Sequence, residues 1–575
     1  MKCRRLLSSL LAFAMVSGLL SGCGNNQAEQ TDPAQNTSTI PATESTPTST
    51  EEPAPDYNRF VDVTSEEART AVLADGILDL AAQLPDAAWN SLPKWNGVTV
   101  PNLQEYGFEY DGQPQIFIRE DMENISDLGF NFVRVPLDTR LFFDWDDPSK
   151  VHLEKLINLD ELVSWGAEFG THVCIDVHFS FGFTTDGDNS NDTLWDNPEE
   201  QEIFLAFWDM LAERYKEVPS SLLSFNLINE PNWGIEEEVY ADLMRRAIER
   251  IRAHTPDRLI FVDMLNTAKE PVYSLAKDKV AQSFHFYEPD ALTHTGVRDD
   301  FGSAYPVISG KGFISQDLGS AEFVIEGNFS AGTEVQIKID EIHLGGTIHL
   351  TADGNEIFSH QYNYDSVGEN GCIYIQEEGS GGEYRGYDNT LKAVLPEDAA
   401  VLRLYTTGDT YWFNLSRFFI RGLSRNYLFE QNLDPIPDGK NVNDIPNPHI
   451  IIHEDGTITD RGNILFRVVD GAYLHDRLAE YKAFSEKTGV AVMMQEFGVY
   501  YPANYSLTLE YLNDLLDAAN ANGLSWCSWD YFGPFSFYQV TEDRLRQGAT
   551  YEEFSNGWVA TEMLAVYQNH LTQNR

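Results

Sequence analysis

Short apolar runs alternate with amphipathic stretches along most of this chain. Continuous apolar runs of this length are typical of parallel strands that are buried on both faces. The stretches between them have the spacing of apolar positions that indicates helices. Eight strand–helix units predict an α/β protein with a (β/α)8 TIM barrel. The eight runs are residues 97–100, 132–137, 173–179, 222–229, 259–265, 280–287, 490–496 and 524–531.

One interval interrupts this alternation, between the sixth strand and the helix that should follow it. About 170 residues lie there, far more than an ordinary βα loop holds. They show short alternating runs such as 335–339 and 401–405, and Asp353-Gly354 is a hairpin signal between two runs. We therefore predict an all-β sandwich, within residues 308–423, inserted after strand six.

The N-terminus predicts export and anchoring. A basic start is followed by an apolar run that is too short to span a bilayer. Leu20-Ser21-Gly22-Cys23 resembles a bacterial lipobox, in which Cys23 would become the lipidated first residue; the alternative is a plain signal peptide with an incidental cysteine. The Ser-, Thr- and Pro-rich stretch that follows cannot bury enough apolar surface to fold. We expect an extracellular lipoprotein on the bacterial cell surface.

These segments give a complete domain plan. We expect a signal peptide over 1–22, a disordered tether over 23–56, and a catalytic barrel over 57–300 and 446–575. Residues 301–445 would hold the inserted sandwich and its return linker. The insert is rich in aromatic residues, so it is either a carbohydrate-binding module or a brace that shapes the barrel's cleft.

Charge narrows the range of partners. The 575 residues include 39 Lys and Arg against 90 Asp and Glu, for a formal net charge of −51. Nucleic acids and anionic lipids both require a basic surface. We therefore expect no nucleic-acid partner, no membrane contact beyond the lipid anchor, and a monomer. Besides Cys23, the mature chain would keep only Cys174, Cys372 and Cys527, an odd and scattered set that predicts free thiols.

Polar residues gather where the predicted strands end, which is the end of a TIM barrel that carries the chemistry. The run LSFNLINEP delivers Asn229 and Glu230, and Pro231 ends the strand. The run VMMQEFG delivers Glu496. Two carboxylates at one barrel mouth are what glycoside hydrolysis requires. The other strand-end residues, each of which alone could be structural, are Arg134, His178, His285, Tyr287 and Trp529.

Seven segments agree with one family in spacing, order and strand placement. They are LPKWNGVTV, LGFNFVRVP, VCIDVH, FNLINEP, SFHFY, MQEFG and SWCSWDYF. Together they resemble the family-five glycoside hydrolases, the cellulase and mannanase type of retaining β-glycanase. The resemblance covers roughly residues 92–532 without the insert.

The resemblance implies a role for each strand-end residue. Glu230 would be the general acid/base and Glu496 the nucleophile. Since two nearby carboxylates repel each other, one of them should keep its proton, and Arg134 with the Tyr287 hydroxyl would hold the other ionised. The other implied roles are a contact to the sugar 2-OH for Asn229, a hydrogen-bond network for His178 and His285, and a stacking floor for Trp529.

The predicted function is retaining hydrolysis of β-1,4-linked glucan or a related plant polysaccharide, without a cofactor and without a metal. Mannan, xyloglucan or β-1,3-glucan remain alternative substrates. A surface glycan-binding lipoprotein with an inactive barrel is the alternative from another class, although such proteins usually lack one of the two acids. The acidic loop over residues 186–192 could hold calcium, but no Glu closes it, so we expect a solvated loop.

Overall fold

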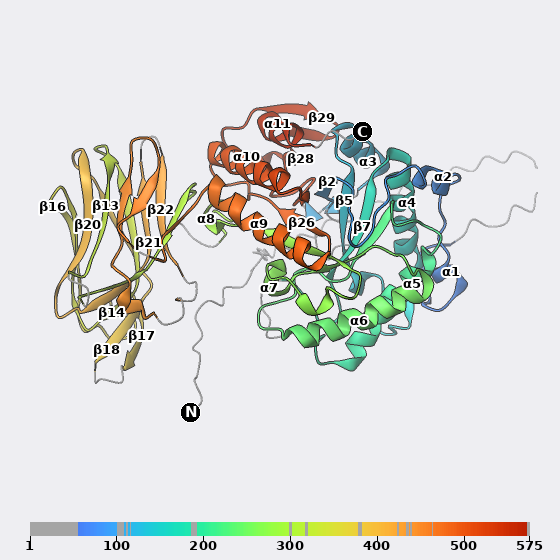
Figure 1. Cartoon of the computed structure of the whole chain (residues 1–575), viewed down its shortest axis with the longest axis horizontal. Helices are drawn as coiled ribbons and strands as arrows, with labels where there is room; N and C mark the ends of the chain where they lie inside the picture. Colours follow the sequence, from blue (N-terminus) through green and yellow to red (C-terminus); the bar gives the residue numbers. More distant parts are fainter. Residues whose placement is uncertain are drawn as a thin grey trace, which may run out of the picture.

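The computed structural model shows an α/β barrel beside a β-sandwich (Figure 1). It describes residues 56–100, 109–110, 113–114, 117–185, 192–297, 302–316, 320–377, 382–422, 425–432, 436, 440–462 and 464–571. The signal peptide, the lipobox with Cys23 and the tether before residue 56 lie outside these ranges. Among the described helices, none has the length and apolar character that crossing a membrane requires.

Eight parallel strands close into the predicted (β/α)8 TIM barrel. Their residues are buried along their whole length, which explains the continuous apolar runs in the sequence. In order around the barrel they are β2 (Asn96–Thr99), β5 (Phe132–Asp138), β7 (His172–Phe179), β8 (Leu223–Asn226), β9 (Ile260–Asp263), β10 (Ala281–Phe286), β26 (Val492–Phe497) and β27 (Ser525–Ser528).

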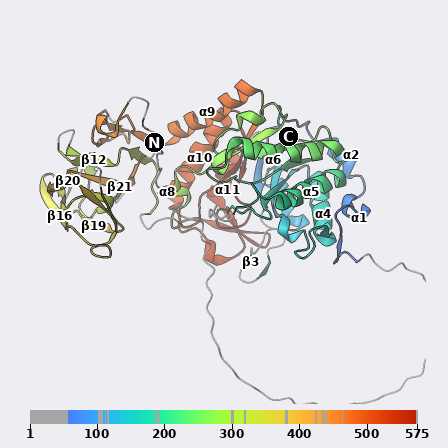
Figure 2. The same ribbon diagram turned by 90° about the horizontal axis from the view of Figure 1, so that it is seen from below.

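Helices surround the barrel, with α4 and α5 on the side away from the sandwich and α9 and α10 on the side nearest to it (Figures 1 and 2). Glycines in the left-handed region end α4 and α9, because Gly170 and Gly489 have φ of 71° and 75°. The longer helices are α3 (Arg119–Asp127), α4 (Leu153–Phe169), α5 (Pro198–Arg214), α6 (Glu237–His254), α9 (Gly471–Thr488), α10 (Tyr505–Ala521) and α11 (Thr561–Asn569).

Residues 58–84, before the barrel, form separate short elements. The segment begins with strand β1 (Phe60–Asp62), which pairs with β6 (Lys150–His152). Two short helices follow, α1 (Glu66–Arg69) and α2 (Ile77–Ala81). The segment is broken into short elements because it packs against the barrel in pieces. The remaining short elements of the barrel are β3 (Glu109–Tyr110), β4 (Gln113–Pro114), α7 (Leu265–Ala268), α8 (Asp290–Thr293), β28 (Tyr538–Gln539), β29 (Tyr551–Phe554) and β30 (Gly557–Ala560).

The inserted strands form two stacked sheets around a shared apolar core. The nine-stranded sheet contains β11 (Val307–Gly310), β12 (Phe313–Ser315), β14 (Glu334–His343), β17 (Cys372–Glu377), β18 (Glu383–Tyr387), β19 (Thr390–Val394), β21 (Trp412–Arg421), β22 (Asn426–Gln431) and β25 (Arg467–Val469). The six-stranded sheet contains β13 (Glu322–Phe329), β15 (Gly346–Ala352), β16 (Asn355–Tyr362), β20 (Ala399–Gly408), β23 (His449–Ile452) and β24 (Ile458–Asp460).

The far boundary of the insert lies later in the chain than the sequence pattern suggests. We expected the barrel to resume at residue 446, but β23, β24 and β25 still pair with strands of the two sheets. Each of these strands has only three or four residues, too few to show an alternating pattern. The Asp353-Gly354 hairpin is confirmed: it joins β15 to β16, and both residues have positive φ, at 46° and 83°.

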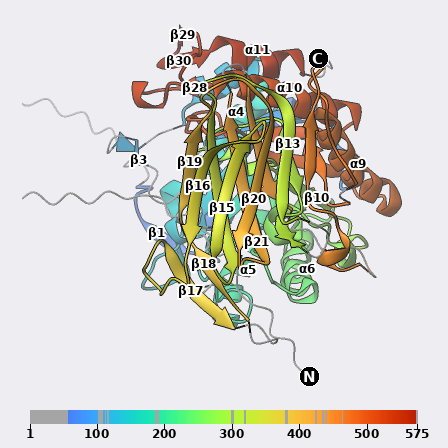
Figure 3. The ribbon, with the colours of Figure 1, turned by 90° about the vertical axis from the view of Figure 1, so that its left-hand side faces the viewer.

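The nine-stranded sheet lies on the side of the insert toward the barrel, and the six-stranded sheet faces away (Figures 1 and 3). A small apolar cluster joins the two bodies. At its edge the Tyr305 hydroxyl donates to Asp514 at 2.6 Å, and Arg425 pairs with Glu510 at 2.9 Å. The residues of the cluster are Ala291, Ala304, Val307, Phe419, Leu428 and Val469, with Tyr473 packed against them.

Candidate active site

Two glutamates meet at the C-terminal ends of the barrel strands. Glu230 follows β8, and Glu496 lies near the end of β26, three positions further around the barrel. One carboxylate oxygen of each acid and a ring nitrogen of His285 lie within 4.8 Å of one another. This separation is in the range of a pair that attacks and protonates one glycosidic bond, and is too short for the roughly 6.5–9.5 Å that an inverting pair needs.

Two hydrogen-bond donors contact the Glu496 side chain. Arg134 from β5 donates to Oε2 at 2.9 Å, and the Tyr287 hydroxyl donates to Oε1 at 2.8 Å. The Glu496 side chain is only 9% exposed. Burial and the nearby Glu496 charge raise the pKa of Tyr287, so this phenol remains a hydrogen-bond donor.

Arg134 is fully buried and needs several partners, because an unpaired buried charge is costly. Its guanidinium contacts Asp176 at 3.1 Å and donates to the side-chain oxygen of Asn229 at 2.7 Å. Burial alone would lower the pKa of Arg134, but Asp176, Asp263 and Glu496 raise it. The arginine therefore supplies a permanent positive charge beside Glu496.

Glu230 has different surroundings. Its side chain is 23% exposed, and no arginine contacts its carboxylate within the described residues. Burial raises its pKa, with Lys269 acting in the opposite direction. Its backbone has φ of 43°, a strained value for a residue with a side chain, and its N–H donates to Asp263 at 3.0 Å. The site thus pairs one buried carboxyl group that contacts an arginine with one whose pKa is raised by burial.

His285 lies between the two acids. Its Nδ1 is 2.8 Å from Oε1 of Glu230 and 3.6 Å from Oε2 of Glu496. Its Nε2 faces Asp263 at 3.4 Å. Burial lowers the pKa of His285, which favours the neutral ring. A neutral ring can form a hydrogen bond with Glu230 without adding a charge to the site.

His178, Asn229 and Trp529 form the remaining wall. His178 Nδ1 lies 2.7 Å from Asp176, and burial lowers the pKa of His178 to about 4. Its Nε2 is therefore placed to accept from the Asn229 amide, at 3.3 Å. The half-buried Trp529 ring stacks on His178, with centroids 5.1 Å apart and planes inclined by 18°. All eight strand-end residues expected from the sequence thus meet at one end of the barrel.

Three residues of this network were not anticipated from the sequence. Asp176, Asp263 and Asn226 are fully buried on β7, β9 and β8, and they connect Arg134 with His178, His285 and the Glu230 backbone. The side chain of Asn226 donates to Asp263 at 3.0 Å. The available signal was an acid within an otherwise apolar strand, in Asp176-Val177-His178 and Val262-Asp263.

Comparison with known proteins agrees with this geometry. Residues 95–313 match the family model described as cellulase (glycosyl hydrolase family 5). Residues 95–313 thus form a segment of the glycosyl hydrolase family 5 type. The matched residues include strands β2 to β10 with Glu230, whereas Glu496 lies beyond them, so closure of the barrel brings the second acid to the family 5 segment.

Individual relatives of this chain include two bacterial proteins. Cellodextrinase A of Ruminococcus flavefaciens is 30% identical over 186 residues, which are 32% of this chain and 54% of the relative. Endoglucanase C of Acetivibrio thermocellus is 28% identical over 185 residues, 31% of this chain and 52% of the relative. The chain thus spans about half the length of the curated relatives it matches.

A solved structure supports the fold of this chain. A crystal structure described as that of a glycoside hydrolase superposes with a TM-score of 0.50 at 19% identity, covering 84% of this chain and 100% of the other. At this identity the likeness concerns the fold alone.

Two features of the chain bear on metal binding. Glu230, His285 and Glu496 are close enough to hold a metal ion, but Arg134 already places a positive charge 2.9 Å from Glu496. That charge would repel a cation at the same carboxylate. Of the acidic loop over 186–192, only Asp192 is described, and it accepts hydrogen bonds from Asn232 and Thr184.

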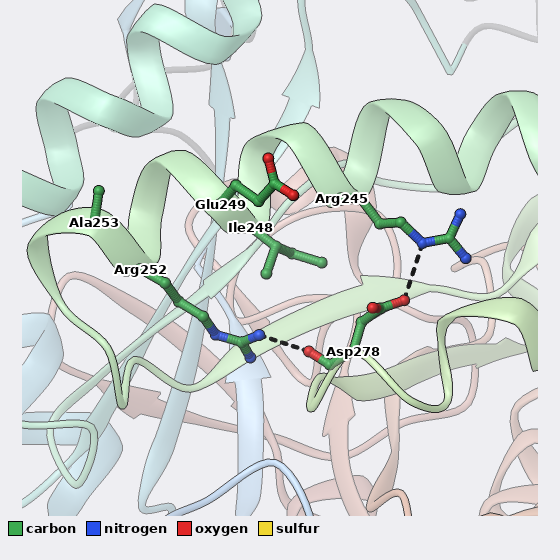
Figure 4. Close-up of a pocket in the computed structure, with 6 residues that line it drawn as sticks. All are labelled: Arg245, Ile248, Glu249, Arg252, Ala253 and Asp278. Atoms are coloured by element: carbon green, nitrogen blue, oxygen red, sulfur yellow. Dashed lines mark hydrogen bonds and ion pairs between the residues drawn. The ribbon is translucent and has the colours of Figure 1, made fainter.

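A hollow lies between α6 and the segment that holds Asp278, where Figure 4 shows two arginines of the helix around Asp278. Arg245 Nε pairs with the Asp278 carboxylate at 3.1 Å, and Arg252 donates to its backbone oxygen at 2.6 Å. Asp278 precedes β10, so the hollow is at the opposite end of that strand from the two acids. Its charges satisfy one another, which indicates a structural role.

Proposed function

We propose that this protein hydrolyses β-1,4-linked glucan with retention of anomeric configuration. The observation that carries the proposal is the pair of acids within 4.8 Å whose surroundings differ in charge. Glu496 is ion-paired with Arg134, while Glu230 lies in a site that raises its pKa. A nucleophile must be ionised and a general acid must keep its proton, so the two environments assign the two roles.

In the first step Glu496 attacks the anomeric carbon while Glu230 protonates the departing glycosidic oxygen. The bond to the leaving sugar breaks, and a glycosyl ester forms on Glu496. Arg134 and Tyr287 orient the carboxylate for this attack through their hydrogen bonds to its two oxygens. His285, at 2.8 Å, fixes the Glu230 carboxyl on the side of the leaving group.

In the second step Glu230 acts as a base, because it has lost its proton to the leaving group. It takes a proton from water, whose oxygen attacks the same anomeric carbon and releases Glu496. Two displacements at one carbon restore the original configuration. Both steps are displacements at the anomeric carbon, assisted by proton transfer from or to Glu230. Side chains and water supply every reacting group besides the substrate, so the proposed mechanism uses no cofactor.

The walls of the site would bind the sugar. The Asn229 amide, held by Arg134 and His178, is placed to contact the sugar 2-OH. The half-buried Trp529 ring presents an aromatic plane to the apolar C–H face of a pyranose. We infer that the polysaccharide lies across this floor with the scissile bond between the two acids.

Hydrolysis of purified polysaccharides tests the proposal. Reducing-sugar release would be measured on carboxymethylcellulose, mixed-linkage β-glucan, glucomannan, xyloglucan and laminarin, with Glu496→Gln as the inactive control. We expect release from the β-1,4-glucans that the Gln variant abolishes. Equal release by Glu496→Gln, or none from any polysaccharide, would refute the assignment and favour a sugar-binding protein.

A β-1,3-glucan is the second candidate substrate. Probable glucan 1,3-beta-glucosidase A of Aspergillus fumigatus is 26% identical over 175 residues, covering 29% of this chain and 42% of the relative. The acids act on the anomeric carbon in either case, so the linkage depends on the loops that shape the cleft. Release from laminarin exceeding that from the β-1,4-glucans would identify this alternative.

We also propose that the protein acts outside the cell, anchored through lipid on Cys23. The lipobox pattern at residues 20–23 and the Ser/Thr/Pro-rich stretch after it support this location. Polysaccharides are too large to enter a cell, so an enzyme that cleaves them must meet them outside. The wild type should label with radioactive palmitate and sediment with membranes, and Cys23→Ala should do neither; labelling of the variant would contradict the anchor.

A further inference from the structure

The nine-stranded sheet of the insert carries a group of aromatic side chains on its outer surface. They come from five strands or strand ends that are distant in sequence but adjacent in the sheet. We call this group the aromatic face; it consists of Phe313, His343, Tyr374, Tyr384, Tyr411 and Trp412.

Strand register places these side chains away from the sandwich core. On β14, Ile342 belongs to the core, so its neighbour His343 points to the other side of the sheet. On β21, Phe413 belongs to the core, and Trp412 beside it points outward by the same alternation. The outer surface of this sheet is the one that docks on the barrel through Phe419 and Leu428, so the aromatic face looks toward the barrel side of the insert.

The rings form a continuous path across the sheet. Centroid distances are 6.3 Å from Tyr374 to Tyr384, 5.4 Å from Tyr384 to Trp412 and 5.1 Å from Trp412 to Phe313. A Cβ at Gly386 would lie 2.1 Å from the Tyr374 ring, so only glycine there allows the ring to rest flat on the sheet. Any residue larger than glycine at position 386 would therefore displace the Tyr374 ring from the aromatic face.

Exposure and polar neighbours distinguish this surface from a core. Tyr374 is 38% exposed and Tyr411 is 41% exposed. The Tyr374 hydroxyl donates to Glu341 at 2.5 Å, and the Asn414 amide donates to the other oxygen of the same carboxylate at 3.4 Å. The Tyr374 and Tyr411 rings are thus open to solvent beside hydrogen-bonding groups, while Trp412, at 9% exposed, packs between its neighbouring rings.

We propose that the aromatic face binds an uncharged β-linked glucan chain and holds it beside the barrel. A pyranose has apolar C–H faces that stack on aromatic rings and a rim of hydroxyls that donate to carboxylates such as Glu341. The acidic protein, with a net charge of −51, would repel anionic polymers. This inference rests on the proposed function for its choice of polymer, because one chain would then occupy both the face and the cleft.

Native gel electrophoresis through mixed-linkage β-glucan tests the proposal. The full chain would carry Glu496→Gln so that the polymer is not cut, and retardation would be compared with and without Tyr374→Ala plus Tyr384→Ala. The matched control is Tyr405→Ala, because Tyr405 lies on the outer surface of the opposite sheet, between His349 and Arg403. We expect the double variant to bind about tenfold more weakly, and the control to bind as the parent does.

The outcomes separate this proposal from the proposed function. Equal retardation of the double variant and its parent, or no retardation of the parent, would refute glucan binding by the aromatic face. This holds even if the protein with Glu496 intact hydrolyses glucan. If the double variant is retarded less than its parent, but the protein with Glu496 intact hydrolyses no glucan, glucan binding by the aromatic face is supported and the catalytic proposal is refuted. The single variant Tyr374→Ala, at an exposed ring, serves if the double variant does not show the circular dichroism spectrum of the parent.

Discussion

At the residue scale, Glu230 and Glu496 have the same side chain but different neighbours. Arg134 and Tyr287 hold Glu496, whereas Glu230 contacts His285 and has a pKa raised by burial. The sequence predicted both acids because each ends an apolar strand. It did not predict Asp176 or Asp263, because their importance depends on which strands are neighbours in the barrel. Their contacts to Arg134 and His285 exist only once the barrel closes.

Glu230→Ala tests the role of the general acid. We expect turnover of β-glucan to fall by about 10²–10⁴-fold, the usual contribution of such catalysis. An aryl cellobioside with a dinitrophenolate leaving group needs no protonation, so formation of its glycosyl ester should be nearly unaffected. Pre-steady-state release of dinitrophenol measures this step. Glu238→Ala, at an exposed helix position, is the control; an equal loss on both substrates would contradict the assignment.

Lys269→Met tests the charge environment of Glu230. The Lys269 charge lowers the pKa of Glu230, in opposition to burial. Without this charge the carboxylate form is less favourable, so the pKa of Glu230 should rise further. Because activity is lost at high pH when the acid loses its proton, the alkaline limb of the kcat/KM profile should move to higher pH. The control Lys277→Met, at an exposed position, should leave the alkaline limb in place. A shift of the alkaline limb to lower pH in Lys269→Met would contradict the account.

At the element scale, apolar runs predicted all eight barrel strands, because a strand buried on both faces must be continuously apolar. The same reasoning missed β23 to β25, which are too short to show a pattern, and the broken structure of residues 58–84. The latter segment depends on contacts to other elements rather than on local propensity. The backbone N–H of Val72 donates to the buried Asp160 of α4 at 2.7 Å.

Asp160→Asn tests whether the contacts of Asp160 stabilise the fold. Asp160 also accepts from Arg214 at 2.8 and 2.5 Å and from the Tyr215 hydroxyl at 2.9 Å. Removing its charge leaves the buried Arg214 uncompensated, so the free energy of unfolding should fall by about 3 kcal/mol. Denaturant unfolding measures the change, with the exposed Asp242→Asn as a control that should change it little. A fall in the free energy of unfolding of less than about 0.5 kcal/mol would show that the Asp160 contacts do not stabilise the fold.

At the scale of the whole molecule, the sequence predicted a barrel interrupted by a β-sandwich, but not how the two bodies meet. Tyr305, Arg425 and the apolar cluster around Phe419 join them. Tyr305 lies 209 residues from its partner Asp514, and Arg425 lies 85 residues from its partner Glu510. The first and last strands of the insert are neighbours, with Val307 opposite Val469. The insert can therefore be removed without separating the barrel segments on either side.

Replacing residues 308–468 with a short Gly-Asn turn tests this arrangement. We expect the barrel to fold, because its eight strands and their core contain no residue of the insert. Exposure of the cluster around Ala304 should lower the melting temperature by several degrees. Hydrolysis of short cello-oligosaccharides should persist, and binding to polymer should weaken. An unfolded product by circular dichroism would show that the two bodies form one folding unit.

The central claim is that Glu496 forms a covalent bond to the sugar during turnover. A 2-deoxy-2-fluoro cellobioside with a fluoride leaving group slows both steps and allows the glycosyl enzyme to accumulate. Intact mass spectrometry followed by peptide mapping should find one added fluorocellobiosyl group on the peptide that contains Glu496. Adduct on Glu230, or turnover of cellobiosides with no adduct and with the inverted anomer as first product, would contradict the claim.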